Sequence, residues 1–345
     1  MLFESITPTT PPIIAEIGLA HDGSLGQALS YIDATAQSGA EIVKFQIHFG
    51  EYESTRHETF RVQFSNQDKT RLDYWTRTSF SEEQWILIKN YCESKGLVFT
   101  SSVFSIKALK LLLKLKVDLV KIGSGDLLNE ELAEGLTDYQ GLILLSTGLA
   151  NYKDIESALR IYSANHQRGK IILMQCTSKY PTPLTESGVN YIKNLEEIFK
   201  APFGYSDHTK GLTAAKVSIV QGAKVVEKHV NFDLRMFGPD TSSSITFEEL
   251  TDLVGFRNDY KLISEPYNKN QISNQLEDVK KLFGRSVTLH RNLPKGHILV
   301  KEDLTLKKPE GGEFRWRDLD KIIGRRLTRD LTSDEFLTTN DLSDK

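Results

Sequence analysis

The stretch LGQALSYIDATAQSGAEIVKFQI, residues 25–47, contains one complete unit of the fold that the sequence predicts. Apolar residues recur at helical spacing from Leu25 to Ser38, and Gly39 ends that pattern. A short run of β-branched and apolar residues follows at positions 41–47. The stretch therefore predicts a helix that leads directly into a buried strand.

The same unit recurs along the chain. Predicted strands occupy residues 12–17, 41–47, 97–100, 119–122, 142–146, 171–175, 202–205 and 224–229. Predicted helices occupy residues 25–38, 82–94, 106–115, 152–165, 189–199, 213–221 and 247–263, with Ser81 as an N-terminal cap. Eight strands that alternate with helices favour an α/β fold, the closed (β/α)8 TIM barrel. A doubly wound open sheet is the alternative, but residues 18–23 lack the G-x-G-x-x-G loop expected there.

The residue pattern of the sequence changes after the last predicted helix. Residues 1–263 are predicted as the barrel domain, residues 264–282 as a polar linker and residues 283–345 as a small separate domain. Within the barrel, the polar residues 48–80 form an unusually long connection. We expect a lid or substrate loop there, with a disordered insertion as the alternative.

The composition excludes several classes of protein. The 345 residues carry a net charge of −3 with acids and bases mixed, so no nucleic-acid partner is expected. Two cysteines are too few for a disulfide framework, and the first residues lack the pattern of a signal peptide. The apolar runs are too short to span a membrane. We expect a cytoplasmic α/β enzyme without a membrane partner.

Nearly every predicted strand ends in polar residues that can bind a ligand or take part in catalysis. Catalytic groups of a barrel gather at the carboxyl ends of the strands, so these side chains should line one site. They include Glu16, Lys44, Gln46, Ser102, Lys121, Ser124, Asp126, Ser146, Ser206, His208, Glu227 and His229, with Tyr180 shortly after the sixth strand.

Two histidines point to a metal. The seventh, eighth and first strands become neighbours when a barrel closes, so His208, His229 and Glu16 should face one region. Two imidazoles and a carboxylate suit Mn²⁺, Fe²⁺, Co²⁺ or Zn²⁺, with water and substrate completing the coordination. Two structural, hydrogen-bonded histidines are the alternative.

Two lysines need a separate explanation. Lys44 and Lys121 are costly inside a barrel mouth unless an anion meets them. One interpretation is a phosphate site, in which nearby serines donate hydrogen bonds and Gly123 and Gly125 let backbone N–H groups approach. A Schiff-base lysine and two snorkelling surface lysines are the alternatives.

Eight motifs, in order, resemble the sialic acid synthase family, which includes N-acetylneuraminate, legionaminate and pseudaminate synthases. They are AEIG (15–18), KFQ (44–46), KIGSG (121–125), LSTG (145–148), YPTP (180–183), SDHT (206–209), EKH (227–229) and GPD (238–240). The C-terminal segment resembles the family's antifreeze-like SAF domain, a β-clip. The resemblance implies a metal-dependent synthase that condenses phosphoenolpyruvate with an N-acylated hexosamine aldehyde and water, releasing phosphate. A related condensation of phosphoenolpyruvate with a sugar phosphate or another aldehyde is the alternative.

The resemblance also implies roles for individual residues. His208 and His229 correspond to metal ligands, with Mn²⁺ expected and Mg²⁺ or Co²⁺ as alternatives. Positions that bind phosphoenolpyruvate correspond to Lys44, Ser102, Lys121, Ser124, Ser146 and Ser206. Positions that bind the sugar correspond to Gln46, Tyr180, Asp240 and, in the SAF domain, Lys308. The expected catalytic residues are Glu16, Asp126, Lys44 and Lys121. The family also implies a homodimer with swapped SAF domains, and a mechanism that needs no lysine imine.

The chain departs from the family's pattern around the sugar. Asp126 stands where the family usually has Glu, and Ala20 stands where it has Asn. Lys308 takes the place of an arginine and cannot reproduce its bidentate fork, although Arg315 and Arg317 lie close by in the sequence. These departures predict an unusual acceptor, different from plain N-acetylmannosamine.

Overall fold

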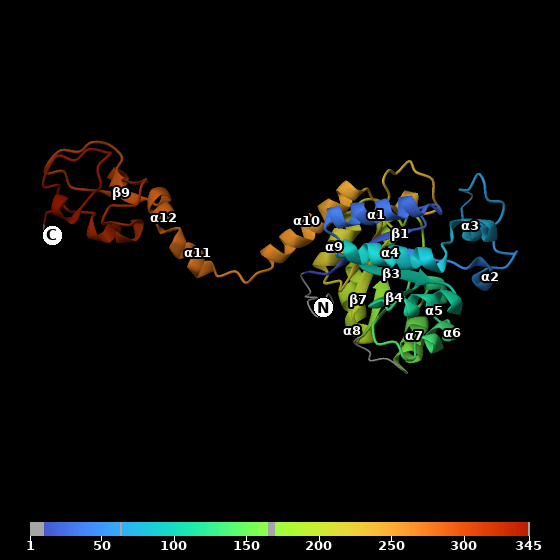
Figure 1. Cartoon of the computed structure of the whole chain (residues 1–345). Coiled ribbons are helices and arrows are strands. Elements are labelled where there is room, and N and C mark those ends of the chain that lie inside the picture. The colour runs from blue at the N-terminus through green and yellow to red at the C-terminus, as the bar shows by residue number, and fades with distance from the viewer. Residues whose placement is uncertain (1–9, 63, 165–169, 344–345) are drawn as a thin grey trace. The chain divides into compact units, whose positions relative to one another are not determined.

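Eight parallel strands close into a barrel in the order of the sequence, from β1 to β8. Helices lie on the outside of these strands (Figure 1). This computed structural model describes residues 10–62, 64–164 and 170–343. The barrel belongs to the first of two units, Met1–Glu265, and the second unit is Pro266–Lys345. The predicted (β/α)8 barrel is therefore confirmed.

The strands lie close to their predicted positions. They are β1 (Ile13–Gly18), β2 (Ile42–Ile47), β3 (Val98–Val103), β4 (Leu119–Ile122), β5 (Leu142–Ser146), β6 (Ile171–Gln175), β7 (Phe203–Asp207) and β8 (Val226–His229). The helices of this unit are α1 (Leu25–Ser38), α2 (Gly50–Glu53), α3 (Arg71–Thr78), α4 (Glu82–Ser94), α5 (Ile106–Lys114), α6 (Glu130–Gly135), α7 (Tyr152–Ser163), α8 (Ile192–Phe199), α9 (Thr213–Val220) and α10 (Phe247–Ile263).

The differences from the predicted helices are local. The sequence pattern does not predict the short helices α2, α3 and α6, which each span eight residues or fewer. The helix predicted over residues 152–165 ends at Ser163, and residue 165 lies outside the described residues. The predicted cap at Ser81 is confirmed, because its side chain and that of Gln84 bond reciprocally to the backbone.

Strand alternation gives the inside of the barrel two different ends. The end nearest the strand N-termini is closed by apolar side chains, which are Ile14, Ile42, Leu119, Leu144, Ile172, Met174 and Val225. Two residues further along β1, β2 and β4 lie Glu16, Lys44 and Lys121, which are also buried. Polar groups therefore occupy the end of the barrel where the strands finish.

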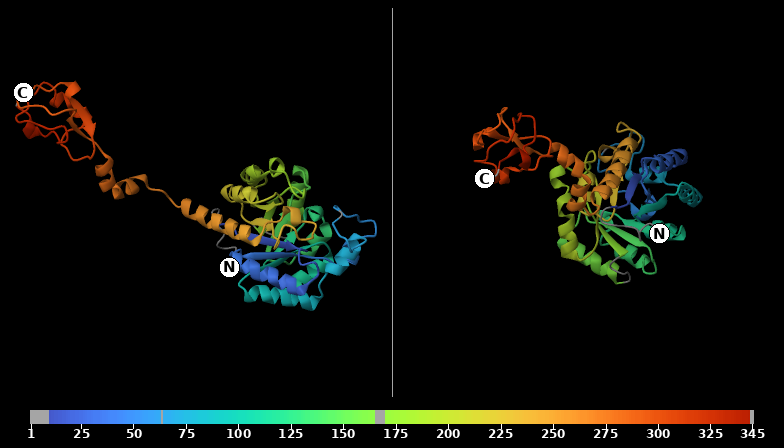
Figure 2. Two further views of the ribbon diagram at one scale, coloured as in Figure 1. Left: turned by 90° about the horizontal axis from the view of Figure 1, so that it is seen from above. Right: turned by 90° about the vertical axis from the view of Figure 1, so that its left-hand side faces the viewer.

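Most of the core lies between the strands and the helices that surround them (Figure 2). Gly204 on β7 is required by close packing inside the barrel, because a Cβ there would lie 2.6 Å from both Met174 Sδ and Val225 Cγ1. The tight core holds the strands in register, and this fixes the positions of the side chains at their ends.

The second unit has a core of its own. It contains α11 (Lys269–Gln275), α12 (Glu277–Phe283) and an antiparallel pair, β9 (Ser286–Leu289) and β10 (Leu304–Lys307). Its buried residues include Val287, Leu304 and Leu331. All of α11 and most of α12 fall in residues 264–282, the stretch predicted as a linker. The predicted domain boundaries stay predictions. None of the helices formed by the described residues is long and apolar enough to cross a membrane.

Candidate active site

A cavity of about 500 Å³ lies where the barrel strands end. Every barrel residue predicted for the site lines it, namely Glu16, Lys44, Gln46, Ser102, Lys121, Ser124, Asp126, Ser146, Tyr180, Ser206, His208, His229 and Asp240. Glu227, also expected among the strand-end residues of the site, lines the cavity as well. The lining further includes His48, Glu53 and Arg61, which the strand-end pattern did not indicate. Parallel strands thus bring together residues far apart in the sequence.

Two buried lysines and two buried carboxylates form a charged cluster in the cavity. Lys44 Nζ lies 3.1 Å from Glu16 Oε2 and 3.5 Å from Glu227 Oε1. Lys121 Nζ lies 2.7 Å from Glu227 Oε2. The lysines are only 3% and 2% exposed, so the alternative of snorkelling surface lysines is wrong. Burial of these charges is tolerated because each has a partner of opposite sign.

The two carboxylates have opposite acid–base character. Burial raises the pKa of Glu16 to about 7, against the pull of Lys44 and with a further push from Glu227. Burial would also raise the pKa of Glu227, but the charges of Lys121 and Lys44 hold it well below its usual range. Glu227 is therefore the anion that balances the lysines, and Glu16 is the carboxyl group able to exchange a proton near neutral pH.

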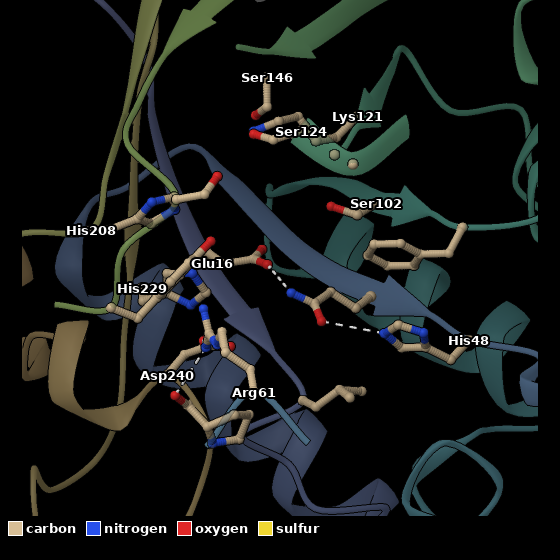
Figure 3. Close-up of a pocket in the computed structure, with 18 of the residues that line it drawn as sticks. Glu16, His48, Arg61, Ser102, Lys121, Ser124, Ser146, His208, His229 and Asp240 are labelled. Atoms are coloured by element: carbon tan, nitrogen blue, oxygen red, sulfur yellow. Dashed lines mark hydrogen bonds and ion pairs between the residues drawn. The ribbon is translucent and has the colours of Figure 1, made fainter. Parts of the chain in front are cut away.

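Hydroxyl groups lie beside the lysines. Ser102 Oγ accepts a hydrogen bond from Lys44 Nζ at 2.9 Å. Ser124 and Ser146 lie next to Lys121, on the side of the cavity opposite Asp240 (Figure 3). Ammonium and hydroxyl donors in a buried place suit a phosphate or carboxylate group.

The two histidines are held as neutral imidazoles. The His208 and His229 ring centroids are 5.7 Å apart. Burial lowers the pKa of His208 to about 3, helped by His229, and burial also lowers the pKa of His229 to about 4. His208 Nδ1 lies 3.0 Å from the Thr177 carbonyl oxygen and so donates to it, which leaves Nε2 without a proton. Ser206 Oγ lies 3.4 Å from Nε2 but donates its proton to Glu227 Oε1. Neutral rings with free lone pairs are the form that binds metals.

The predicted third partner does not join the histidines. Glu16 Oε1 accepts a hydrogen bond from Gln46 Nε2 at 3.0 Å, and Oε2 faces Lys44. Within residues 10–62, 64–164 and 170–343, no group of three His, Cys, Asp or Glu side chains could hold a metal ion. The donor set therefore fits a divalent cation only as a pair of imidazoles, with water and substrate as the remaining ligands.

A stack of three side chains lines the histidine side of the cavity. The Tyr180 ring stacks on His208 with centroids 4.2 Å apart, and Arg61 Cζ lies 3.8 Å from the Tyr180 centroid. Arg61 Nη2 also donates to Asp240 Oδ1 at 2.8 Å (Figure 3). Arg61 comes from the long connection 48–80, so the described part of that connection is a folded wall of the cavity, as expected for a substrate loop.

Asp126 places a carboxyl group in the cavity, although its side chain is shorter than that of the glutamate expected from the family resemblance. It ends a single 3₁₀ turn after β4 and accepts a hydrogen bond from Asn129 Nδ2 at 3.0 Å. Burial raises the pKa of its carboxyl group, and the charge of Glu53 adds to the effect.

Lys308 belongs to the second unit. Its Nζ lies 4.7 Å from the centroid of the Phe283 ring. Arg315, the nearby alternative to it, is paired with Glu310 and donates to the Gly312 carbonyl oxygen at 2.8 Å. The predicted contact of Lys308 with the sugar stays a prediction.

Some of the cavity residues without a predicted role could have been found from the sequence pattern, and others could not. Glu227 lies two residues before His229 on β8, and strand alternation alone places the two on one face. His48 follows Gln46 by the same spacing, just beyond β2. Arg61 and Glu53 carry no such signal, because they belong to the connection 48–80, where no strand alternation applies.

Comparisons with known proteins cover most of the chain. Residues 31–265 match the NeuB family and residues 284–343 match the SAF domain. An uncharacterized protein of Methanocaldococcus jannaschii is 32% identical over 96% of this chain and 94% of its own length. The N,N'-diacetyllegionaminic acid synthase of Legionella pneumophila is 30% identical over 93% of this chain and 91% of its own. The crystal structure of N-acetylneuraminic acid (sialic acid) synthetase from Leptospira borgpetersenii, in complex with citrate, has a TM-score of 0.67 and 29% identity, covering 78% of this chain and 92% of that chain.

Proposed function

We propose, since this chain belongs to the NeuB family, that it condenses phosphoenolpyruvate with the aldehyde of an N-acylated hexosamine and water, and releases phosphate. The family assignment confirms the prediction of an enzyme, a phosphoenolpyruvate-dependent nonulosonic acid synthase with a SAF domain. The acceptor sugar, the metal and the roles of individual residues belong to the proposal.

The observation that carries the proposal is the division of the cavity into two chemically different sides. Lys44, Lys121 and the neighbouring serines offer donors for the phosphate and carboxylate groups of phosphoenolpyruvate. The stack of Arg61, Tyr180 and His208 with Asp240 offers aromatic surface and hydrogen-bonding groups for a sugar. Both lysines have carboxylate partners, and the reaction needs no imine from either.

The reaction forms a carbon–carbon bond and a bond between C2 and the water oxygen, breaks the bond between C2 and the bridging oxygen, and moves a proton from the water to the aldehyde oxygen. C3 of the enol attacks the aldehyde carbon, a water molecule attacks C2, and phosphate leaves with the bridging oxygen. Glu16 and Asp126 are carboxyl groups in the cavity with raised pKa values, so they are suited to hold the proton that the water loses. The buried lysines stabilise the negative charge on phosphate as the bond to C2 breaks.

His208 and His229 would hold the divalent cation, for which Mn²⁺ is expected and Mg²⁺ or Co²⁺ are alternatives. When bound, such an ion supplies Lewis acidity to the sugar aldehyde. The neutral state of both rings supports this assignment. The swapped homodimer and the cytoplasmic setting also stay predictions.

The proposal is tested by measuring phosphate release from phosphoenolpyruvate with Mn²⁺ and a panel of acceptors. The panel contains N-acetylmannosamine, a 2,4-diacetamido-2,4,6-trideoxyhexose and an N-acetylhexosamine 6-phosphate. Release with an unphosphorylated N-acyl sugar supports the proposal, and equal turnover of every such sugar removes the idea of an unusual acceptor. Release only with a sugar phosphate favours the related aldol reaction, and no release with any acceptor refutes both.

Isotopic water tests which bond of phosphoenolpyruvate is broken, the bond from C2 to the bridging oxygen or the bond from phosphorus to that oxygen. In ¹⁸O-labelled water the proposed attack at C2 leaves the phosphate unlabelled, because its bridging oxygen comes from phosphoenolpyruvate. Labelled phosphate would show attack at phosphorus and would overturn the role given to the lysines.

A further inference from the structure

His48 is a buried histidine that the proposed reaction does not use. Its ring lies between two aromatic rings, with centroids 3.9 Å from Trp75 and 4.3 Å from Phe104 and interplanar angles of 11° and 7°. The residue is 4% exposed. Two nearly parallel neighbours fix the plane of the imidazole, so its two nitrogens point in set directions.

Both nitrogens of His48 meet polar side chains. Nδ1 lies 2.5 Å from Glu53 Oε1. Nε2 lies 3.4 Å from Gln46 Oε1, the contact that the dashed line at His48 marks in Figure 3. A carboxylate can only accept, so Nδ1 carries a proton. The other oxygen of Glu53 has no hydrogen-bond partner among the described residues, and its side chain is 5% exposed. This buried carboxylate therefore depends on His48.

The Gln46 amide is placed between His48 and Glu16. Its Nε2 donates to Glu16 Oε1 at 3.0 Å, so its oxygen faces His48 Nε2. A glutamine amide has donor and acceptor ends of nearly equal size, and only its neighbours decide which end points where. In this orientation both nitrogens of His48 donate, and Glu53 balances the charge of the ring.

We infer that His48 and Glu53 form a positioning pair that holds the Gln46 amide with its N–H toward Glu16 and the acceptor side of the cavity. Glu53 ends α2 and Trp75 lies in α3, so the connection 48–80 supplies both the pair's anion and one of its stacking rings. The inference rests on the proposed function and on the sugar-binding role that the family resemblance implies for Gln46, so the pair should affect handling of the acceptor more than that of phosphoenolpyruvate.

His48→Phe is the first test, because it keeps a ring between Trp75 and Phe104 and removes both hydrogen bonds. The expected result is a rise of about tenfold in KM for the acceptor, as for loss of one hydrogen bond to a charged group, with KM for phosphoenolpyruvate within about twofold. His21→Phe is the matched control: His21 is also buried and stacks on Phe80 at 4.6 Å, but does not line the cavity. Equal changes in both KM values, or the same change in the control, would mean a merely structural role.

A double-mutant cycle tests whether His48 acts through Gln46. Gln46→Ala should raise KM for the acceptor, and adding His48→Phe should then change it no further. Additive effects of the two substitutions would refute the inference.

Nitrogen NMR of ¹⁵N-histidine-labelled protein provides a test that needs no turnover. We expect both ring nitrogens of His48 to give the signals of protonated, donating nitrogens, and the Nδ1 signal to change after Glu53→Gln. A single proton on His48 in the unchanged protein would overturn the inference. If no acceptor gives phosphate release, the proposed function fails and this measurement still decides whether the pair exists.

Discussion

Glu227→Gln is the substitution that tests the charge balance of the site most directly. Glu227 is 4% exposed, accepts from Lys121 Nζ at 2.7 Å and from Ser206 Oγ at 2.8 Å, and lies 3.5 Å from Lys44 Nζ. The amide keeps the shape of the side chain and removes its charge. Two buried ammonium groups then face only one carboxylate, Glu16.

The expected loss of stability follows from that imbalance. Breaking a buried ion pair by removing one partner costs about 3–5 kcal/mol, because a charge is left unpaired. For a unit of this size that is roughly 6–10 °C in Tm. Burial already lowers the pKa of Lys121, so the loss should shrink as the pH rises from about 7 to about 9 and this ammonium gives up its proton more readily.

Phosphoenolpyruvate should restore part of the stability that Glu227→Gln loses. Its phosphate and carboxylate supply the negative charge that the substitution removes, and the lysines no longer divide their attraction between ligand and Glu227. Thermal denaturation with and without phosphoenolpyruvate should therefore show a larger stabilisation of Glu227→Gln than of the unchanged protein. An unchanged Tm, or a smaller stabilisation by the ligand, would refute the reasoning.

Glu41→Gln is the matched control for this experiment. Glu41 pairs with Arg257 and accepts from the backbone N–H of Ile13 at 3.0 Å, immediately before β2 and at the opposite end of the barrel from the cavity. The same chemical change there should lower Tm and leave the shift produced by phosphoenolpyruvate as it is in the unchanged protein.

Three further outcomes are expected. His229→Ala, or removal of metal by a chelator, should abolish phosphate release while phosphoenolpyruvate still raises Tm; retained turnover would contradict the metal assignment. Arg61→Ala should raise KM for the acceptor a few-fold, the scale of an exposed ion pair and a cation–π contact, and leave KM for phosphoenolpyruvate unchanged. Lys228→Met should destabilise the barrel by about 3–5 kcal/mol in chemical denaturation, because Asp207, 3.1 Å away and fully buried, loses its partner; near-normal stability would contradict this.

The barrel and most of its site could be predicted because both follow from local periodicity. An alternation of two residues decides which side chains point inward, and strand closure then collects the ends of eight strands in one place. Lys44 and Lys121 are separated by 77 positions, yet both contact Glu227, as inward-facing residues at the same level of a barrel should. Glu227 could have been assigned a role by the same rule.

The rest of the site depends on contacts that no periodic pattern encodes. Arg61 reaches Tyr180 and Asp240 from an irregular connection. That connection is held to the barrel by pairs such as Arg77 with Asp22, which only the folded chain brings together. Glu16 illustrates a different limit. The barrel places it next to His229 as predicted, but its carboxylate points to the buried ammonium group of Lys44 instead of the histidines.

The charge balance of the cluster bears on how an anion enters and leaves. When Glu16 is ionised, two carboxylates balance two ammonium groups, and these pairs hold the lysines in place without a ligand. An anion that binds them must therefore compete with Glu227 instead of filling an unopposed cationic pocket. The same competition assists release, because Glu227 can pair again with Lys121 as phosphate departs. A site of lysines alone would bind phosphoenolpyruvate more tightly, but it would also retain the phosphate, and turnover requires that the product leave.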